Sequence, residues 1–222
     1  MPRPPPEGVD ARPAAGWAES LSRLATHFAA GERALRLEFF VELFPNLPEA
    51  LTAAGVGQDK SAPAMAALPA AFRPARRTGM DMALIEAGNA VAVERFMAIQ
   101  GDAFGVRIAA GPTGWRPILE AGLADGSMIA AIGEVGGKAC CGAVIMIGGG
   151  AAELAGVGTL PAYRRHGYAS DLCSRLLQAY FEHTGAPAWL SADDEIAESL
   201  YGALGFHRIG TQLNYGKRPE GG

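Results

Sequence analysis

The sequence has little charge and few cysteines, and each shortage excludes a class of protein. Charged residues make up 19% of the 222 positions and leave a net charge of −4. A non-specific nucleic-acid binder needs a basic face, so we expect no nucleic-acid partner. The cysteines form no disulfide framework and no metal-ligand spacing, so we expect reduced core thiols and no metal at Cys140, Cys141 and Cys173. In a regular strand the adjacent Cys140 and Cys141 point to opposite faces.

No long apolar run is present either. The proline-rich start, 1–6, lacks the apolar segment of a signal peptide. The most apolar stretch, 128–150, is interrupted by Glu134, Lys138 and several glycines, so it does not predict a membrane span. We therefore expect a soluble, cytoplasmic protein with no membrane partner.

Apolar residues, glycine and proline are plentiful. Apolar residues reach 49%, which predicts a folded chain with a sizeable core. The 30 glycines and 15 prolines follow no period, so they indicate many turns. This length fits one ordinary domain or two small ones.

Periodicity divides the chain into a flexible tail over 1–13, an N-terminal part over 14–77 and a more regular part over 78–222. In the N-terminal part, apolar spacing predicts a helix over 17–32, a strand over 35–41, a helix from Asn46 to near Gly55 and a strand over 63–72.

The second part alternates strands and helices. Strands are expected over 80–86 (with Met80, Met82 and Leu84 on one face), 128–133, 139–147, 153–160, 188–191 and 206–216. Helices are expected over 90–104, 168–184 and 195–204, with a shorter one over 115–123 inside a mobile stretch, 105–126. The order predicts an α/β protein with a mixed central sheet flanked by helices and a smaller N-terminal α/β subdomain.

The segment 158–170 is the most informative. A strand ends there, a basic turn follows, and a helix begins at Gly167. The first amides of a helix have no internal partner and lie at the positive end of its dipole, so they favour an anion. Gly167 and Ala169 let a pyrophosphate approach these amides, and Arg164, Arg165 and His166 add positive charge. The alternative is a solvated basic turn before a glycine-started helix.

The sequence matches neither of two other phosphate-binding motifs. Residues 156–161 begin like G-x-G-x-x-G but place Pro161 at the third glycine. No G-K-S or G-K-T sequence occurs, so a triphosphate-binding loop is excluded.

Two motifs resemble the GNAT superfamily of N-acetyltransferases. Arg164-x-x-Gly167-x-Ala169 matches the family's [QR]-x-x-G-x-[GA], and residues 197–206 resemble its A-x-x-L-Y-x-x-L-G-F. The resemblance covers 138–217 and extends less clearly back to 78. Asp194 stands where the family often has asparagine, which replaces a donor with a carboxylate.

The resemblance implies a GNAT fold that uses acetyl-CoA, or another acyl-CoA, as cosubstrate. It implies that Tyr201 protonates the departing thiolate, although an aromatic packed on the next strand would look the same. It also implies that the backbone of two residues holds the pantetheine arm and that six more hold the pyrophosphate: Thr159 and Leu160, then Arg165, His166, Gly167, Tyr168, Ala169 and Ser170.

Attack by an amine needs a base, which in this family usually acts through water. Glu153 is the candidate because it lies in an apolar strand that runs toward the expected thioester position. A salt-bridged or solvent-facing glutamate is the equal alternative.

The N-terminal part is interpreted as a degenerate, non-catalytic GNAT-like half. Residues 48–56 align loosely with 198–206, which places Leu51 opposite Tyr201, and no phosphate-binding turn precedes them. An unrelated extension is the alternative.

Together these features predict an acyl-CoA-dependent N-acetyltransferase that acts on the primary amine of a small molecule or peptide. Trp115 and Phe104 could form an apolar wall of the acceptor site or simply belong to the core. Two rivals stay open: a silent acyl-CoA-binding module with a regulatory role, and a structural domain without ligand. A homodimer also stays open.

Overall fold

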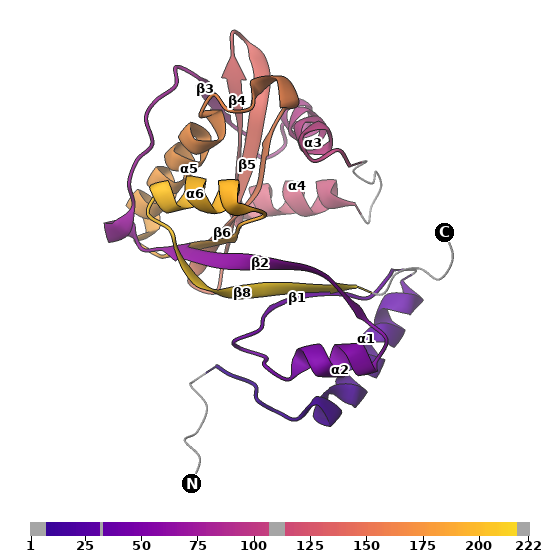
Figure 1. The fold of residues 1–222 in the computed structure, drawn as a ribbon. Coiled ribbons are helices and arrows are strands. Elements are labelled where there is room, and N and C mark those ends of the chain that lie inside the picture. The colour runs from indigo at the N-terminus through magenta and orange to yellow at the C-terminus, as the bar shows by residue number, and fades with distance from the viewer. Residues whose placement is uncertain (1–7, 32, 107–113, 217–222) are drawn as a thin grey trace. The chain divides into compact units, whose positions relative to one another are not determined.

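The computed structural model describes residues 8–31, 33–106 and 114–216, and it divides into two compact units (Figure 1). The first unit comprises Met1–Ala64, Ser191–Asp194 and Arg208–Gly222, and the second comprises Met65–Leu190 and Glu195–His207. This grouping cuts the chain differently from the linear segments 14–77 and 78–222, because the last strand returns to pair with the first.

The first unit packs helices α1 (Ala18–Ala30) and α2 (Leu47–Ala53) against strands β1 (Arg36–Phe40), β8 (His207–Gly216) and β2 (Gly57–Ala67), which are ordered β1-β8-β2. β1 and β8 are antiparallel. The buried core of this unit draws on both helices and on β1 and β8: Leu21, Leu35, Phe39, Leu47, Ala50, Leu51, Val56, Leu213 and Tyr215.

The expected tail, 1–13, lies partly outside the described residues. Within 8–13, the amide of Asp10 donates to the Leu43 carbonyl at 2.8 Å, and the amide group of Asn46 donates to the carbonyls of Ala11 and Arg12 at 3.1 Å each. These bonds attach residues 10–12 to the turn before α2.

The second unit contains a mixed sheet. Its strands are ordered β7 (Ala188–Ser191), β6 (Ala151–Thr159), β5 (Lys138–Gly148), β4 (Met128–Val135) and β3 (Asp81–Leu84). β6 and β7 are parallel, and the other neighbours are antiparallel. The predicted α/β class with a mixed sheet is thus confirmed.

Helices cover both faces of this sheet (Figure 1). α5 (Tyr168–Thr184) lies on one face, and α3 (Ala90–Phe104) and α4 (Trp115–Asp125) lie on the other. The α3 face packs closely: a Cβ at Gly142 would lie 3.0 Å from the Phe96 ring. α5 buries the apolar positions expected from its sequence, Leu172, Leu176, Leu177 and Tyr180. A last helix, α6 (Glu195–Ala203), precedes β8.

Most expected elements are present, and two differ. β2 begins at Gly57 rather than near residue 63 and gives way to a 3-10 turn at Pro69–Ala71. Its first residues are exposed and polar, so they lack the apolar alternation that identifies a strand. Met80 is buried, but Leu84 is 55% exposed, so the residues expected on one face of 80–86 differ in burial. The expected mobile stretch, 105–126, contains α4, and its residues 107–113 lie outside the described residues.

The three cysteines are free and buried, as expected, but Cys140 and Cys141 do not point to opposite faces. Their sulfurs lie 3.7 Å apart. The reason is a bulge: Glu134 pairs with Ala139 and Gly133 pairs with Cys141, so Cys140 is an extra residue that faces no partner in β4.

Gly205, which ends the turn after α6, has a conformation that only glycine adopts easily. Its φ is +98°, and a Cβ there would collide with the backbone carbonyl of Ala71. We expect Gly205→Ala to lower the free energy of unfolding by at least about 2 kcal/mol in urea titrations. Gly202→Ala is the matched control, because a Cβ at this helical glycine meets nothing within 4 Å. The control should raise stability by about 0.5–1 kcal/mol; equal effects of the two changes would contradict this account.

The thiols should be unreactive in the folded protein. Burial disfavours the thiolate, so it raises the pKa of Cys173 to about 12 and also raises the pKa values of Cys140 and Cys141. We expect a thiol-specific disulfide reagent to label none of them between about pH 7 and 9, and all three in concentrated guanidinium chloride. Rapid labelling of the folded protein that increases through pH 8 would disprove this.

Candidate functional site

The site begins where β6 diverges from β7. The two strands pair only at Ala152 with Ala188 and at Glu153 with Trp189, although β6 continues to Thr159. β6 stays paired with β5 on its other side, up to Thr159 opposite Cys141. Residues 154–159 therefore present one backbone edge to an opening within the sheet.

A bulge in β6 lies beside this opening. Ala155 pairs with Val144 and Gly158 pairs with Gly142, so two residues of β6 face one of β5. Gly156 adopts a φ of +56° there, and its carbonyl accepts a hydrogen bond from the Gln100 side chain at 2.7 Å. Gln100 belongs to α3 and is 8% exposed, so a buried amide fixes the bulge.

The end of β6 is fixed by Arg164, the first residue of the basic motif. Its guanidinium donates to the carbonyl of Thr159 at 3.1 Å and to the carbonyl of Ala103 at 2.8 Å. Arg164 thus links β6 to the end of α3, and these neutral carbonyl partners leave its positive charge beside the turn. The amide of Leu160 donates to the carbonyl of Cys140 on β5 at 2.9 Å. Because successive amides of a strand point to opposite sides, the amide of Thr159 points away from β5, toward the edge that diverges from β7.

The turn itself contains a strained residue. Arg165 has a φ of +66°, the only positive φ of a non-glycine residue within the described ranges, and its side chain is exposed. The left-handed conformation costs about 1–2 kcal/mol in a residue with a Cβ. Strain of this kind often occurs at functional sites. The next residue, His166, stacks on the Tyr168 ring with centroids 5.5 Å apart, and its Nδ1 donates to the Arg164 carbonyl at 2.7 Å.

The first turn of α5 faces a polar cavity of about 410 Å³. Gly167 is the N-cap of the helix at φ +80° and, lacking a side chain, makes no side-chain capping hydrogen bond. Four of the predicted phosphate-binding residues line the cavity, together with a segment that precedes β3: His166, Gly167, Tyr168 and Ser170, with Ala75, Arg76, Arg77 and Thr78.

A second cavity, of about 360 Å³, is apolar and lies on the α3 side of the sheet. Phe104 and Trp115, expected as an apolar wall, both line it, as does the bulge at Gly156. Sequence reasoning missed Gln100, the one amide side chain among its described lining residues. An isolated glutamine on the apolar side of a helix was the only signal available.

Glu153 is half-buried in β6 and pairs across the sheet with Met146. Alternate residues of a strand share a face, so Glu153 lies on the same side as Ala155. Both Met146 and Ala155 line the apolar cavity. The predicted base is therefore next to this cavity.

Tyr201 lies on the inner side of α6 and is 7% exposed. Its ring meets Phe206 edge-on at 6.1 Å, and its carbonyl accepts the amide of Phe206 at 3.0 Å. Burial and the contact with Phe206 therefore hold the Tyr201 ring in one orientation.

Within the described ranges, no group of three or more histidine, cysteine, aspartate or glutamate side chains could bind a metal ion. Nor does any helix there have the length and apolar character needed to cross a membrane.

A diverging parallel pair in a mixed sheet, a bulge, and a basic turn before a helix together define the acetyltransferase fold of the GNAT type. Solved structures support this. A GCN5-related N-acetyltransferase from Kribbella flavida is 27% identical, with a TM-score of 0.73 over 96% of this chain and 81% of that one. A GCN5-related N-acetyltransferase from Sphaerobacter thermophilus is 17% identical, with a TM-score of 0.61 over 92% and 67%. A functionally unknown conserved protein from Staphylococcus epidermidis is 13% identical, with a TM-score of 0.59 over 97% and 88%.

Residues 108–206 match the model of the acetyltransferase (GNAT) family. This match covers less than half of the chain; together with the solved structures it identifies an acetyltransferase (GNAT) domain, as the two motifs predicted, and supports an enzyme of the acetyltransferase class. No curated protein matches the sequence.

The strain at Arg165 can be measured separately from its charge. Arg165→Gly removes both the charge and the steric cost of the left-handed conformation, whereas Arg165→Ala removes only the charge. Since glycine also has the more flexible unfolded chain, we expect the glycine variant to be more stable than the alanine variant by about 0.5–1 kcal/mol. Urea denaturation measures this difference, and an alanine variant that is more stable than the glycine variant by about 0.5–1 kcal/mol would show that the turn carries no strain.

Proposed function

We propose that the chain moves the acetyl group of acetyl-CoA onto a primary amine in one direct transfer. The observation that carries this proposal is the divergence of β6 from β7 directly ahead of the α5 N-terminus. A pantetheine arm needs backbone partners along an open strand edge, and a pyrophosphate needs unpaired amides and nearby cations. Residues 154–170 offer both in one continuous segment.

The reaction balances without another reactant. The amine nitrogen attacks the thioester carbonyl carbon, a C–N bond forms and the C–S bond breaks. The amine loses one proton, and the sulfur gains one. In this proposal Glu153 takes the first proton through water, and Tyr201 donates the second. A phenol with a pKa of about 10 can protonate the thiolate of a thiol whose pKa is about 8.5.

The amine would enter through the apolar cavity. Its described lining includes Phe96, Phe104 and Trp115 and contains no carboxylate that could pair with a second ammonium group. This favours an amine carried on an apolar body, whether a small molecule or the end of a peptide. Fixing such a body next to Glu153 would contribute mainly by orienting the amine.

The test begins with calorimetric titration of acetyl-CoA into the wild type. We expect micromolar binding that Arg165→Glu weakens at least tenfold, about 1.4 kcal/mol, because the change reverses charge beside the phosphates. Arg23→Glu is the matched control: it makes the same charge change at an exposed position of α1 and should leave binding unchanged.

Turnover then separates the enzyme from a silent acyl-CoA-binding module. Tyr201→Phe should retain acetyl-CoA binding within about twofold but slow thiol release with an amine acceptor by about 100-fold or more. If Tyr201→Phe turned over as fast as the wild type, Tyr201 would not be the residue that protonates the thiolate. Absence of acetyl-CoA binding in the wild type would overturn the proposed function as a whole.

A further inference from the structure

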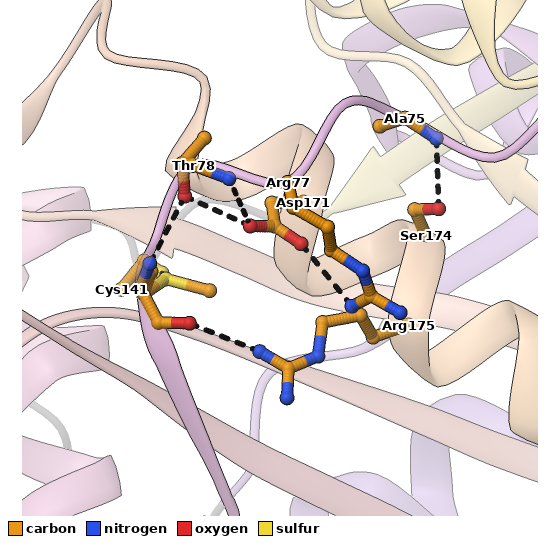
Figure 2. Close-up of polar contacts among 8 residues, drawn as sticks. Ala75, Arg77, Thr78, Cys141, Asp171, Ser174 and Arg175 are labelled. Atoms are coloured by element: carbon orange, nitrogen blue, oxygen red, sulfur yellow. Dashed lines mark hydrogen bonds and ion pairs between the residues drawn. The ribbon is translucent and has the colours of Figure 1, made fainter.

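The segment before β3 follows α5 from its end toward its beginning, and Figure 2 shows the contacts that Ala75, Arg77 and Thr78 make with the first part of the helix. Phe72 packs its ring against Phe181 at 5.3 Å, the amide of Ala75 donates to the Ser174 hydroxyl at 2.9 Å, and Thr78 contacts Asp171. We call residues 72–79 the connector. Its successive contacts approach the N-terminus of α5, so its last residues lie beside the basic turn.

A buried carboxylate fixes the connector at this end. Asp171 is 1% exposed and accepts hydrogen bonds from the amide and the hydroxyl of Thr78, both at 2.8 Å (Figure 2). Arg77 donates to its other oxygen at 3.4 Å. Burying a carboxylate is costly unless it is paired and hydrogen-bonded, and these three bonds meet that need. A further bond, from Arg175 to the Met80 carbonyl at 3.1 Å, fixes the chain just beyond Thr78.

The anchored connector forms one wall of the polar cavity of about 410 Å³. Arg76 and Arg77 line it from one side, and the first turn of α5 lines it from the other. This wall therefore carries two neighbouring guanidinium groups.

The positive charge in this cavity is not fully compensated. Arg77 is paired with Asp171, but Arg76 is exposed and makes no ion pair or hydrogen bond with any residue in the described ranges. Arg165, in the basic turn just before the residues that line this cavity, likewise has no acidic partner among the described residues. Arginine presents several donors in a planar array that matches a phosphate group, so an anion with phosphate geometry fits this wall.

We propose that Arg76, held in place by the two hydrogen bonds between Thr78 and Asp171, binds the 3′-phosphate of coenzyme A. This inference rests on the proposed function. Coenzyme A carries its phosphates in two places, a pyrophosphate and a 3′-phosphate on the ribose. The amides of α5 are assigned to the pyrophosphate, so the second phosphate needs cations from another element, and the connector supplies them. Arg76 is thus a specificity residue, and Asp171 is a positioning residue that acts through Thr78.

The test compares coenzyme A with 3′-dephospho-coenzyme A by calorimetric titration of the full chain. We expect the wild type to bind coenzyme A at least tenfold more tightly. Arg76→Ala should weaken coenzyme A binding about tenfold and change dephospho-coenzyme A binding by less than twofold. Arg73→Ala is the matched control, because Arg73 belongs to the same connector but does not line the cavity, and it should change neither affinity.

The positioning role has its own readout, the ratio of the two affinities. Asp171→Asn and the nearly isosteric Thr78→Val should both lower this ratio toward one. A general loss of folded structure would weaken both ligands equally and leave the ratio unchanged. If Asp171→Asn does not fold, Thr78→Val still decides the question, because it removes only the two hydrogen bonds of the Thr78 hydroxyl, with Asp171 and with the Met80 amide, and keeps the bond from the Thr78 amide to Asp171.

Three results would overturn the inference. Equal wild-type affinity for the two ligands would show that the 3′-phosphate is not recognised, while the proposed function would stand. An equal loss of selectivity in Arg73→Ala would indicate general electrostatic attraction instead of a site at Arg76. Binding of neither ligand would overturn both this inference and the proposed function.

Discussion

The separation of two parallel strands determines most of the candidate site. Once β6 leaves β7 after Glu153, its backbone groups on that side lose the partners that a continuous sheet would supply. Buried backbone polar groups need such partners. Side chains provide some of these hydrogen-bond partners: Gln100 donates to the carbonyl of Gly156, and Arg164 donates to the carbonyl of Thr159. The groups left over, with the amides of α5, are the ones available to a ligand.

Local patterns in the sequence predicted much of this architecture. α3 occupies the expected 90–104 because Asn89 caps it and Gly105 ends it in the left-handed conformation. α5 likewise begins and ends at the residues expected from its apolar spacing, and Gly167 and Gly185 both adopt positive φ at its two ends. Where glycine or a capping side chain determines a boundary, the boundary can be read from a few neighbouring residues.

Features that depend on distant residues could not be predicted in this way. The bulge that brings Cys140 close to Cys141 depends on pairing with β4, which no local pattern of two cysteines reveals. The connector is a similar case. Its sequence indicates only a basic linking segment, and its position follows from a buried aspartate more than 90 residues away. The predicted roles of Glu153 and Tyr201 still depend on the proposed reaction.

Two parts of the chain end a helix in the same way, which bears on the interpretation of the N-terminal half. After α2, the amide of Val56 donates to Leu51 and the amide of Gly55 donates to Thr52. After α6, the amide of Phe206 donates to Tyr201 and the amide of Gly205 donates to Gly202. These residues occupy matching positions in the alignment of 48–56 with 198–206. Such helix endings are common in proteins, so an ancestral duplication stays a prediction.

An open strand edge is also a hazard, because it can pair with a strand of another molecule. The bulge at Gly156 interrupts the regular spacing of backbone donors and acceptors that such a partner would need. The six residues 154–159 therefore leave only a short, irregular template for intermolecular pairing. The bulge on one side of β6 thus makes the free backbone edge on its other side a poor partner for a strand of another molecule.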